Sequence, residues 1–309
     1  MATSGTYNWS LTGTEIITEA LELLGVFGVG ETLSSEDQAT CLRSLNGMIK
    51  TYASKGIGLW KNVEASLIPS YEGYSYSIGP SGDNCSTGMY KTETSVLASS
   101  GDATITVDSD DNITNGDYIG IESNDKSVQW TTVNGVPAAN VVTLTAVLTD
   151  DVAVDNHVYN YTTKIQRPTE IIEVRSVSSS AYETPLLIVS RQQYMGLSNK
   201  SSTGPASQIY YDPLLTDGKM YVWPACSDVQ EYIKFTCKIQ IEDFDSAAND
   251  ADFPQEWLLP LAWNLAVIVA PKFGKGGLID QVFLTIAADM LQSVKDFDHE
   301  NASIFIKAA

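Results

Sequence analysis

The sequence has little histidine, little cysteine and little positive charge. Its 309 residues include two histidines, four cysteines and 18 Lys or Arg against 38 Asp or Glu, for a formal net charge of −20. The cysteines, Cys41, Cys85, Cys226 and Cys237, lie far apart without a CxxC pair, which argues against a zinc cage. The acid excess predicts repulsion of nucleic-acid phosphates and of anionic lipid.

A hydrophobic run long enough for a membrane span is also lacking. The most suggestive segment, residues 253–274 (FPQEWLLPLAWNLAVIVAPKFG), has fifteen uncharged residues between Glu256 and Lys272. About 20 residues are needed to cross a bilayer, and Pro260 and Pro271 interrupt or end the run. The first residues show no basic patch followed by an apolar stretch. We therefore expect no secretory signal, no membrane association and synthesis in a reducing cytoplasm.

Motifs that would mark an enzyme are missing as well. His157 lies in an expected strand and His299 follows the last expected helix, and the chain contains neither GxSxG nor HExxH. The acidic run 108–112 (DSDDN) fails the EF-hand pattern, because Ile113 and Ile119 stand where Gly and Glu are needed. A weaker calcium loop there is a minor alternative. We expect no catalytic residue, cofactor or metal, and not an enzyme.

The two ends of the chain carry helical patterns. Thr12 with Glu15, and Ser35 with Gln38, have the spacing of capping boxes, and apolar residues follow each at intervals of three and four. In the last pattern Leu278, Val282, Ile286 and Met290 repeat every fourth residue. The expected helices span residues 12–25, 35–55, 254–273 and 277–298.

The middle of the chain reads as β structure. Residues 233–241 alternate strictly between apolar and polar, as in a half-buried antiparallel strand. Hairpins are expected around Glu72-Gly73 and around Asp217-Gly218. Residues 91–163, rich in Thr, Val, Asp and Asn, form a separate block of short strands and turns.

These patterns predict an α+β fold. Its terminal helices form a helical bundle beside an antiparallel β region, and a small all-β domain is inserted. The expected organisation is a core of residues 1–90 and 164–309, an insertion of residues 91–163 and, within the core, a C-terminal tail of residues 299–309.

Three segments together resemble a known family. They are residues 16–60 (IITEALELLGVFGVGETLSSEDQATCLRSLNGMIKTYASKGIGLW), the pair PASQIYYDP and GKMYVWP, and residues 253–274 with Pro254, Glu256, Trp257, Leu261 and Ala262. In this order they resemble the head-to-tail connector or adaptor proteins, also called tail accessory factors, of short-tailed bacteriophages. The likeness covers about two thirds of the chain and leaves residues 91–163 without an assigned role.

The resemblance implies a structural virion protein of the phage neck or tail. Such adaptors form a ring, usually of twelve copies, between the portal protein and the tail nozzle or fibre proteins, and DNA passes through the channel during ejection. An acid-rich channel wall would pass DNA without stable binding. The expected portal or subunit interface comprises Trp257, Leu261, Leu265, Ile304, Phe305 and Ile306.

Some alternatives stay open at this point. Ile304, Phe305 and Ile306 could instead pack on the chain's own core. The protein could be another neck or nozzle component, although the paired terminal helices argue against that. A carbohydrate-binding tail module would act through residues 91–163, with Trp130, Tyr118 and Tyr161 stacking on sugars. The competing interpretation makes these three aromatics the core of a small β domain.

Overall fold

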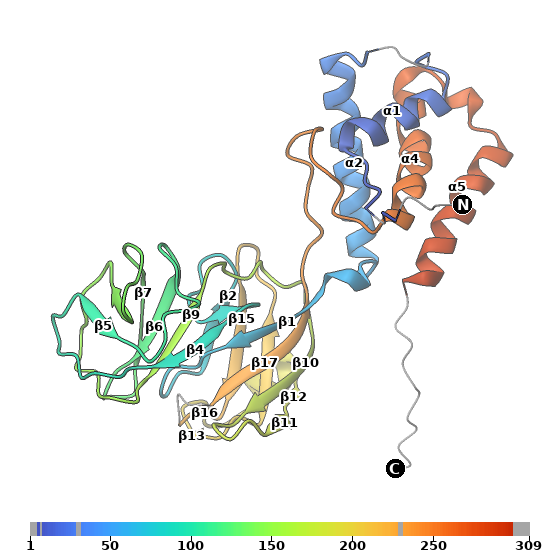
Figure 1. Ribbon diagram of the computed structural model, residues 1–309. Helices are drawn as coiled ribbons and strands as arrows, with labels where there is room; N and C mark the ends of the chain where they lie inside the picture. Colours follow the sequence, from blue (N-terminus) through green and yellow to red (C-terminus); the bar gives the residue numbers. More distant parts are fainter. Residues whose placement is uncertain (1–4, 7, 29–31, 228–230, 299–309) are drawn as a thin grey trace. The chain divides into compact units, whose positions relative to one another are not determined.

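The computed structural model describes residues 5–6, 8–28, 32–227 and 231–298 (Figure 1). The chain is a mixed α+β protein with several antiparallel sheets. It divides into two compact units, which we name the helical unit (Met1–Lys61 with Ile241–Ala309) and the β unit (Asn62–Gln240). Across the described residues, no helix is both long and apolar enough to cross a bilayer.

The helical unit contains four long helices whose starts are set by polar caps. Thr12 and Glu15 form a capping box at the first, as expected, whereas the second is capped by Ser34 instead of Ser35. Asp280 caps the last helix, which therefore begins four residues later than the sequence pattern indicated. The helices are α1 (Gly13–Leu23), α2 (Ser35–Ser54), α4 (Gln255–Val269) and α5 (Gln281–Phe297), with short 3-10 turns at Leu59–Lys61, Ala270–Phe273 and Gly276–Leu278.

The core of the helical unit is centred on α4, which contacts α1, α2 and α5. Pro260 lies inside α4 without ending it, and the expected helix to residue 273 changes to a 3-10 turn after Val269. Gly274 then adopts a left-handed conformation, with φ of 68°, that suits glycine at a helix end. The fully buried side chains include Ile16, Ile17, Leu21, Leu45, Ile49, Trp257, Leu261 and Leu265.

The acidic segment that precedes α4, from residue 241 onward, packs on the helices of the same unit. Phe244 is buried in the helical core, and its backbone N–H and C=O both bond the side-chain amide of Asn46 at 3.0 Å. Gly13 lies so close to Phe244 and Ala247 that a Cβ there would meet atoms at 3.0–3.3 Å. Lys50 also donates to the Ile241 carbonyl oxygen. These contacts fix the segment against α1 and α2.

The β unit contains two sheets that share one hydrophobic cluster. The first has the strand order β11-β10-β17-β1-β3, and the second has the order β12-β14-β15-β2. The first sheet comprises β1 (Asn62–Leu67), β3 (Cys85–Ser86), β10 (Glu170–Val177), β11 (Glu183–Pro185) and β17 (Tyr232–Lys238). The second comprises β2 (Ser75–Ile78), β12 (Leu187–Ile188), β14 (Gln208–Asp212) and β15 (Gly218–Trp223).

One expected hairpin is confirmed and the other is wrong. Strands β14 and β15 pair antiparallel across the Asp217-Gly218 turn. Strands β1 and β2, in contrast, belong to different sheets, and β2 pairs with β15. Both strands bury side chains in the same cluster, so the chain crosses from one sheet to the other at Glu72-Gly73 instead of folding back.

Residues within 91–163 build most of a further sheet with the order β4-β9-β6-β7, and they form their own hydrophobic cluster. Strands expected at residues 103–107, 117–121, 128–133 and 141–145 are present within two residues of these bounds as β5 (Thr104–Thr106), β6 (Tyr118–Glu122), β7 (Val128–Thr132) and β8 (Val141–Thr143). The other strands here are β4 (Tyr90–Glu93) and β9 (His157–Tyr161), and β5 pairs with β8 in a separate two-stranded sheet. The remaining elements are the helix α3 (Arg191–Met195) and the short pair β13 (Thr203–Gly204) and β16 (Ala225–Cys226).

Candidate functional site

Three of the residues expected at an interface lie instead in the interior of the helical unit. Trp257, Leu261 and Leu265 are each at most 2 % exposed, and the Trp257 ring packs against the rings of Tyr52 and Trp60 at 6.3 and 5.5 Å. Contacts of α4 with α1, α2 and α5 cover these side chains almost completely, although Trp257 also borders a small hollow with Trp60, Pro254 and Phe297. Their assignment to an interface remains a prediction that no observation supports. Ile304, Phe305 and Ile306 lie outside the described residues.

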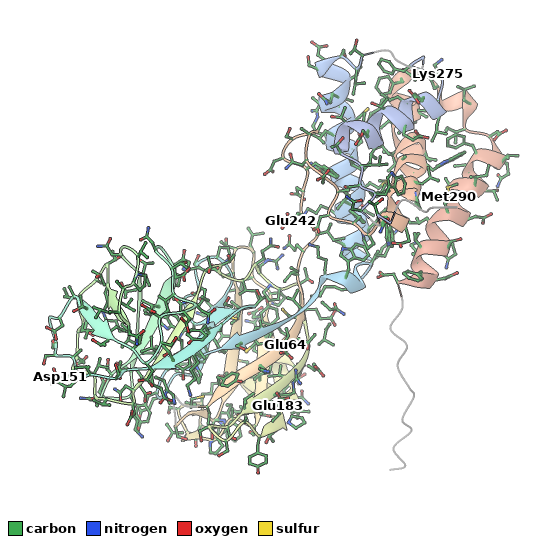
Figure 2. The ribbon with its side chains drawn as sticks, in the orientation of Figure 1. Glu64, Asp151, Glu183, Glu242, Lys275 and Met290 are labelled. Carbon is green, nitrogen blue, oxygen red and sulfur yellow. The ribbon has the colours of Figure 1, made fainter. Side chains whose placement is uncertain are left out.

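Helix α5 exposes apolar side chains that its own unit does not cover. Phe283, Ala287, Leu291 and Val294 face the core. A neighbouring row comprises the exposed Val282, Ile286 and Phe297 and the half-buried Met290, and we call it the α5 stripe (Met290 is labelled in Figure 2). Val282 is 63 % and Phe297 75 % exposed. Single exposed apolar residues are ordinary, but several on one side of a helix make it a candidate interaction surface.

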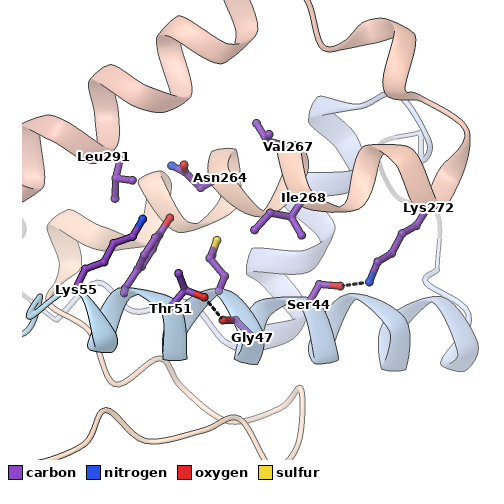
Figure 3. Close-up of a pocket in the computed structure, with 11 residues that line it drawn as sticks. Ser44, Gly47, Thr51, Lys55, Asn264, Val267, Ile268, Lys272 and Leu291 are labelled. Carbon is purple, nitrogen blue, oxygen red and sulfur yellow. Dashed lines mark hydrogen bonds between the residues drawn. The ribbon is translucent and has the colours of Figure 1, made fainter. Parts of the chain in front are cut away.

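A groove on the helical unit adds a second candidate surface (Figure 3). It has a volume of about 530 Å³ and runs between α2 and α4, with Leu291 of α5 at its edge. Its apolar lining includes Met48, Val267 and Ile268, and Ile268 is 42 % exposed. Apolar side chains of a partner could therefore be buried here.

Lysines give this groove its polarity. Lys55 and Lys272 both line it, and Lys272 Nζ donates to Ser44 Oγ at 2.6 Å. Burial raises the pKa of the Tyr52 phenol, which also lines the groove and stays neutral at physiological pH. Basic residues are scarce in this chain, which has more than twice as many acids as bases. Two lysines beside an apolar groove therefore favour a partner surface that combines apolar and acidic side chains.

The structure brings together the three aromatics proposed for sugar stacking. Tyr118 stacks on Tyr161 with centroids 5.1 Å apart, and Trp130 lies at 5.6 Å from Tyr161. Tyr161 is buried and its hydroxyl donates to the Asp83 carbonyl, while the Trp130 ring covers Gly120 so closely that a Cβ there would lie at 2.8 Å. These rings present much of their surface to one another, which favours their interpretation as packing residues.

The other residues singled out by sequence lie apart from one another as far as the structure describes them. His157 lies on β9, where its Nδ1 is 3.4 Å from Glu93 Oε1, and His299 lies outside the described residues. Asp110 accepts a hydrogen bond from the backbone N–H of Asn140, which lies next to β8, and Asp111 accepts one from Ser109 Oγ in its own loop. Within the described parts of the chain, no group of three His, Cys, Asp or Glu residues is placed to hold a metal ion.

Comparison of the chain with protein-family models and with curated proteins yields no match. The most distinctive features of the helical unit are its uncovered α5 stripe and its apolar groove. The four-residue spacing of Val282, Ile286 and Met290 predicts a helix, and the structure places all three on α5. The sequence gives no sign that Leu259 and Ile268 on α4 are exposed, because the residues around them are also apolar.

Proposed function

We propose that this chain is a structural virion subunit, a head-to-tail adaptor that assembles into a ring, of twelve copies by the family resemblance. The ring would join the portal protein to the tail nozzle and form part of the DNA channel. The observation that carries the proposal is the α5 stripe, an apolar row left uncovered on a chain with a net charge of −20. Solvent exposure of such a row costs free energy that a subunit contact would recover.

We also propose a role for each part of the chain. In this proposal, the terminal helices form the assembly bundle and residues 91–163 form an inserted all-β domain with a separate core. The tail residues 299–309 are a further docking element for the portal. The acidic surface suits a channel through which DNA moves without stable binding.

The two surfaces of the helical unit suggest how neighbouring copies meet. A ring needs heterologous contacts, in which one patch of a subunit binds a different patch of the next. The α5 stripe supplies apolar side chains, and Asp289 and Asp296 border it on the helix. The groove supplies an apolar lining with Lys55 and Lys272. Insertion of one copy's stripe into the next copy's groove would match both apolar area and charge.

Negative-stain imaging of the purified chain with and without purified portal protein tests this function. We expect rings of defined symmetry on the portal for the natural sequence. Val282→Glu combined with Ile286→Glu should abolish them, and Ile268→Glu in the groove should do the same, because each replaces apolar side chains that the contact would bury with charged, hydrated ones. Gln281→Glu combined with Ala288→Glu adds the same charge to another side of α5 and should leave the rings intact.

Circular dichroism and urea unfolding must show that each variant keeps its fold. A natural chain that stays free of the portal at micromolar concentration would overturn the adaptor proposal. Rings that persist in both the stripe and the groove variants would overturn only the proposed contact between copies.

A further inference from the structure

The β unit contains a hollow that the adaptor function does not use. Its volume is about 270 Å³, slightly below the roughly 300 Å³ at which pockets for drug-sized ligands begin. Two cross-strand pairs contribute to it, Ser66 with Lys234 on β1 and β17, and Lys91 with Tyr159 on β4 and β9. The full lining is Ser66, Ile68, Met89, Lys91, Tyr159, Tyr232 and Lys234.

Lys91 brings a positive charge to this hollow without an adjacent carboxylate. Within the described residues, no Asp or Glu lies within ion-pair distance of its ammonium group, whose Nζ is 3.0 Å from His157 Nε2. An ammonium can only donate, so Nε2 accepts and the neutral imidazole carries its proton on Nδ1, toward Glu93. The histidine thus holds Lys91 in place but leaves its charge uncompensated.

Lys234 is only loosely paired. Its Nζ is 3.5 Å from Glu64 and 3.6 Å from Glu183, while Arg175 approaches the same two carboxylates at 2.5 and 2.9 Å (Glu64 and Glu183 are labelled in Figure 2). Burial acts to lower the pKa of Lys234, but Glu64, Tyr232 and Glu183 outweigh it and raise the pKa. The group is therefore a cation at neutral pH, with N–H donors left for another acceptor.

The rest of the lining is neutral and suits a sugar ring. Ser66 offers a hydroxyl, Tyr159 and Tyr232 contribute aromatic side chains, and Ile68 and Met89 provide apolar wall. An inorganic anion would contact the two lysines but would make no favourable contact with the aromatic and apolar lining. A neutral sugar would leave the Lys91 ammonium without a counter-charge and would use only the neutral hydrogen-bonding capacity of the hollow.

We propose that this hollow binds an acidic monosaccharide unit, that is, a sugar ring carrying a carboxylate. The carboxylate lies between Lys91 and Lys234, and the ring packs against the tyrosines and the apolar wall. This assignment is independent of the ring-forming surfaces on the helical unit.

Ligand-observed NMR titration of the full chain tests the site with glucuronate, galacturonate and N-acetylneuraminate, and with glucose and acetate as controls. We expect at least one acidic sugar to bind at least about tenfold more tightly than glucose and acetate, with affinity falling as salt is added. Lys91→Gln and Lys234→Gln should each weaken it at least about tenfold, since each removes a charge-assisted hydrogen bond.

Lys219→Gln is the matched control, because Lys219 lies on β15 and does not line the hollow. It should change the affinity less than about twofold. Acidic sugars that bind no better than glucose and acetate would overturn the proposal. Unchanged affinity in both Lys91→Gln and Lys234→Gln would also overturn it, because the binding site would then lie elsewhere.

Discussion

Helices α4 and α5 lie side by side in the helical unit and use their apolar residues differently (Figure 1). Helix α4 is apolar around most of its circumference, and three helices cover most of it. Helix α5 is clearly amphipathic, yet it has more apolar residues than its core-facing side requires. The most hydrophobic segment of this sequence is thus also one of the most buried. The better sign of an interface is apolar surface left over after the core is filled.

The largest expected effect is the loss of stability when a buried side chain of α4 is shortened to alanine. Trp257→Ala should lower the free energy of unfolding of the helical unit by about 3–5 kcal/mol, because it leaves a cavity among Tyr52, Trp60 and Phe253. Leu259→Ala, on the exposed side of the same helix, should stay within about 0.5 kcal/mol of the natural chain. Urea unfolding followed by tryptophan fluorescence and circular dichroism measures both. Equal losses would mean that α4 is not asymmetrically covered.

A matched pair of phenylalanines tests the two sides of α5. Phe283 packs on Trp263 with centroids 4.8 Å apart, whereas Phe297 is 75 % exposed. We expect Phe283→Ala to cost about 2 kcal/mol of unfolding free energy, less than full burial would give, and Phe297→Ala to cost under about 0.5 kcal/mol. Phe297→Ala should instead weaken ring assembly in sedimentation or imaging. The reverse ranking in stability would assign the stripe to the subunit's own core.

The smallest of the expected losses in stability comes from removing the N-terminal cap of α1, one of the helices that cover α4. Thr12→Ala removes the cap and should cost about 1 kcal/mol, and Thr12→Ser should restore most of it. Hydrogen bonds from the Thr12 backbone and then its side chain lower the pKa of Glu15 below its ordinary 4.5. The ionised Glu15 thus adds stability that is present above pH 4.5 and lost as pH falls through the folded pKa.

Urea unfolding at several pH values checks this sign. The stability difference between the natural chain and Thr12→Ala should be full at pH 7 and shrink as the pH falls below 4.5. A difference that grows at acid pH would show that Glu15 does not stabilise the cap in its ionised form.

Local patterns in the sequence predicted much of the fold. The four long helices were visible from caps and three- to four-residue spacing, and the strand β17 from strict alternation. The error at Glu72-Gly73 has a physical reason, since a turn signal specifies a reversal but not which sheet receives the next strand. That choice depends on the pairing of β2 with β15, about 140 residues later along the chain.

The candidate sites were harder to predict from the sequence, because they depend on which other helices or strands cover a given side chain. Periodicity showed that Trp257, Leu261 and Leu265 share a face of α4, but not that α1, α2 and α5 bury it. The hollow with Lys91 and Lys234 joins residues from distant strands, and no local spacing relates them. Two lysines on strands that are far apart in the sequence look like ordinary surface charges until the strand pairing is known.

The β unit begins and ends on neighbouring strands. Asn62, its first residue, is the register partner of Lys238, so the chain enters and leaves this unit at hydrogen-bonded positions. Within the unit the pattern repeats, since Tyr90 pairs with Asn160 at the two ends of the segment 90–160. The first and last residues of each stretch therefore lie close together on paired strands. A segment whose ends lie close together can change in length while the path of the chain on either side stays the same.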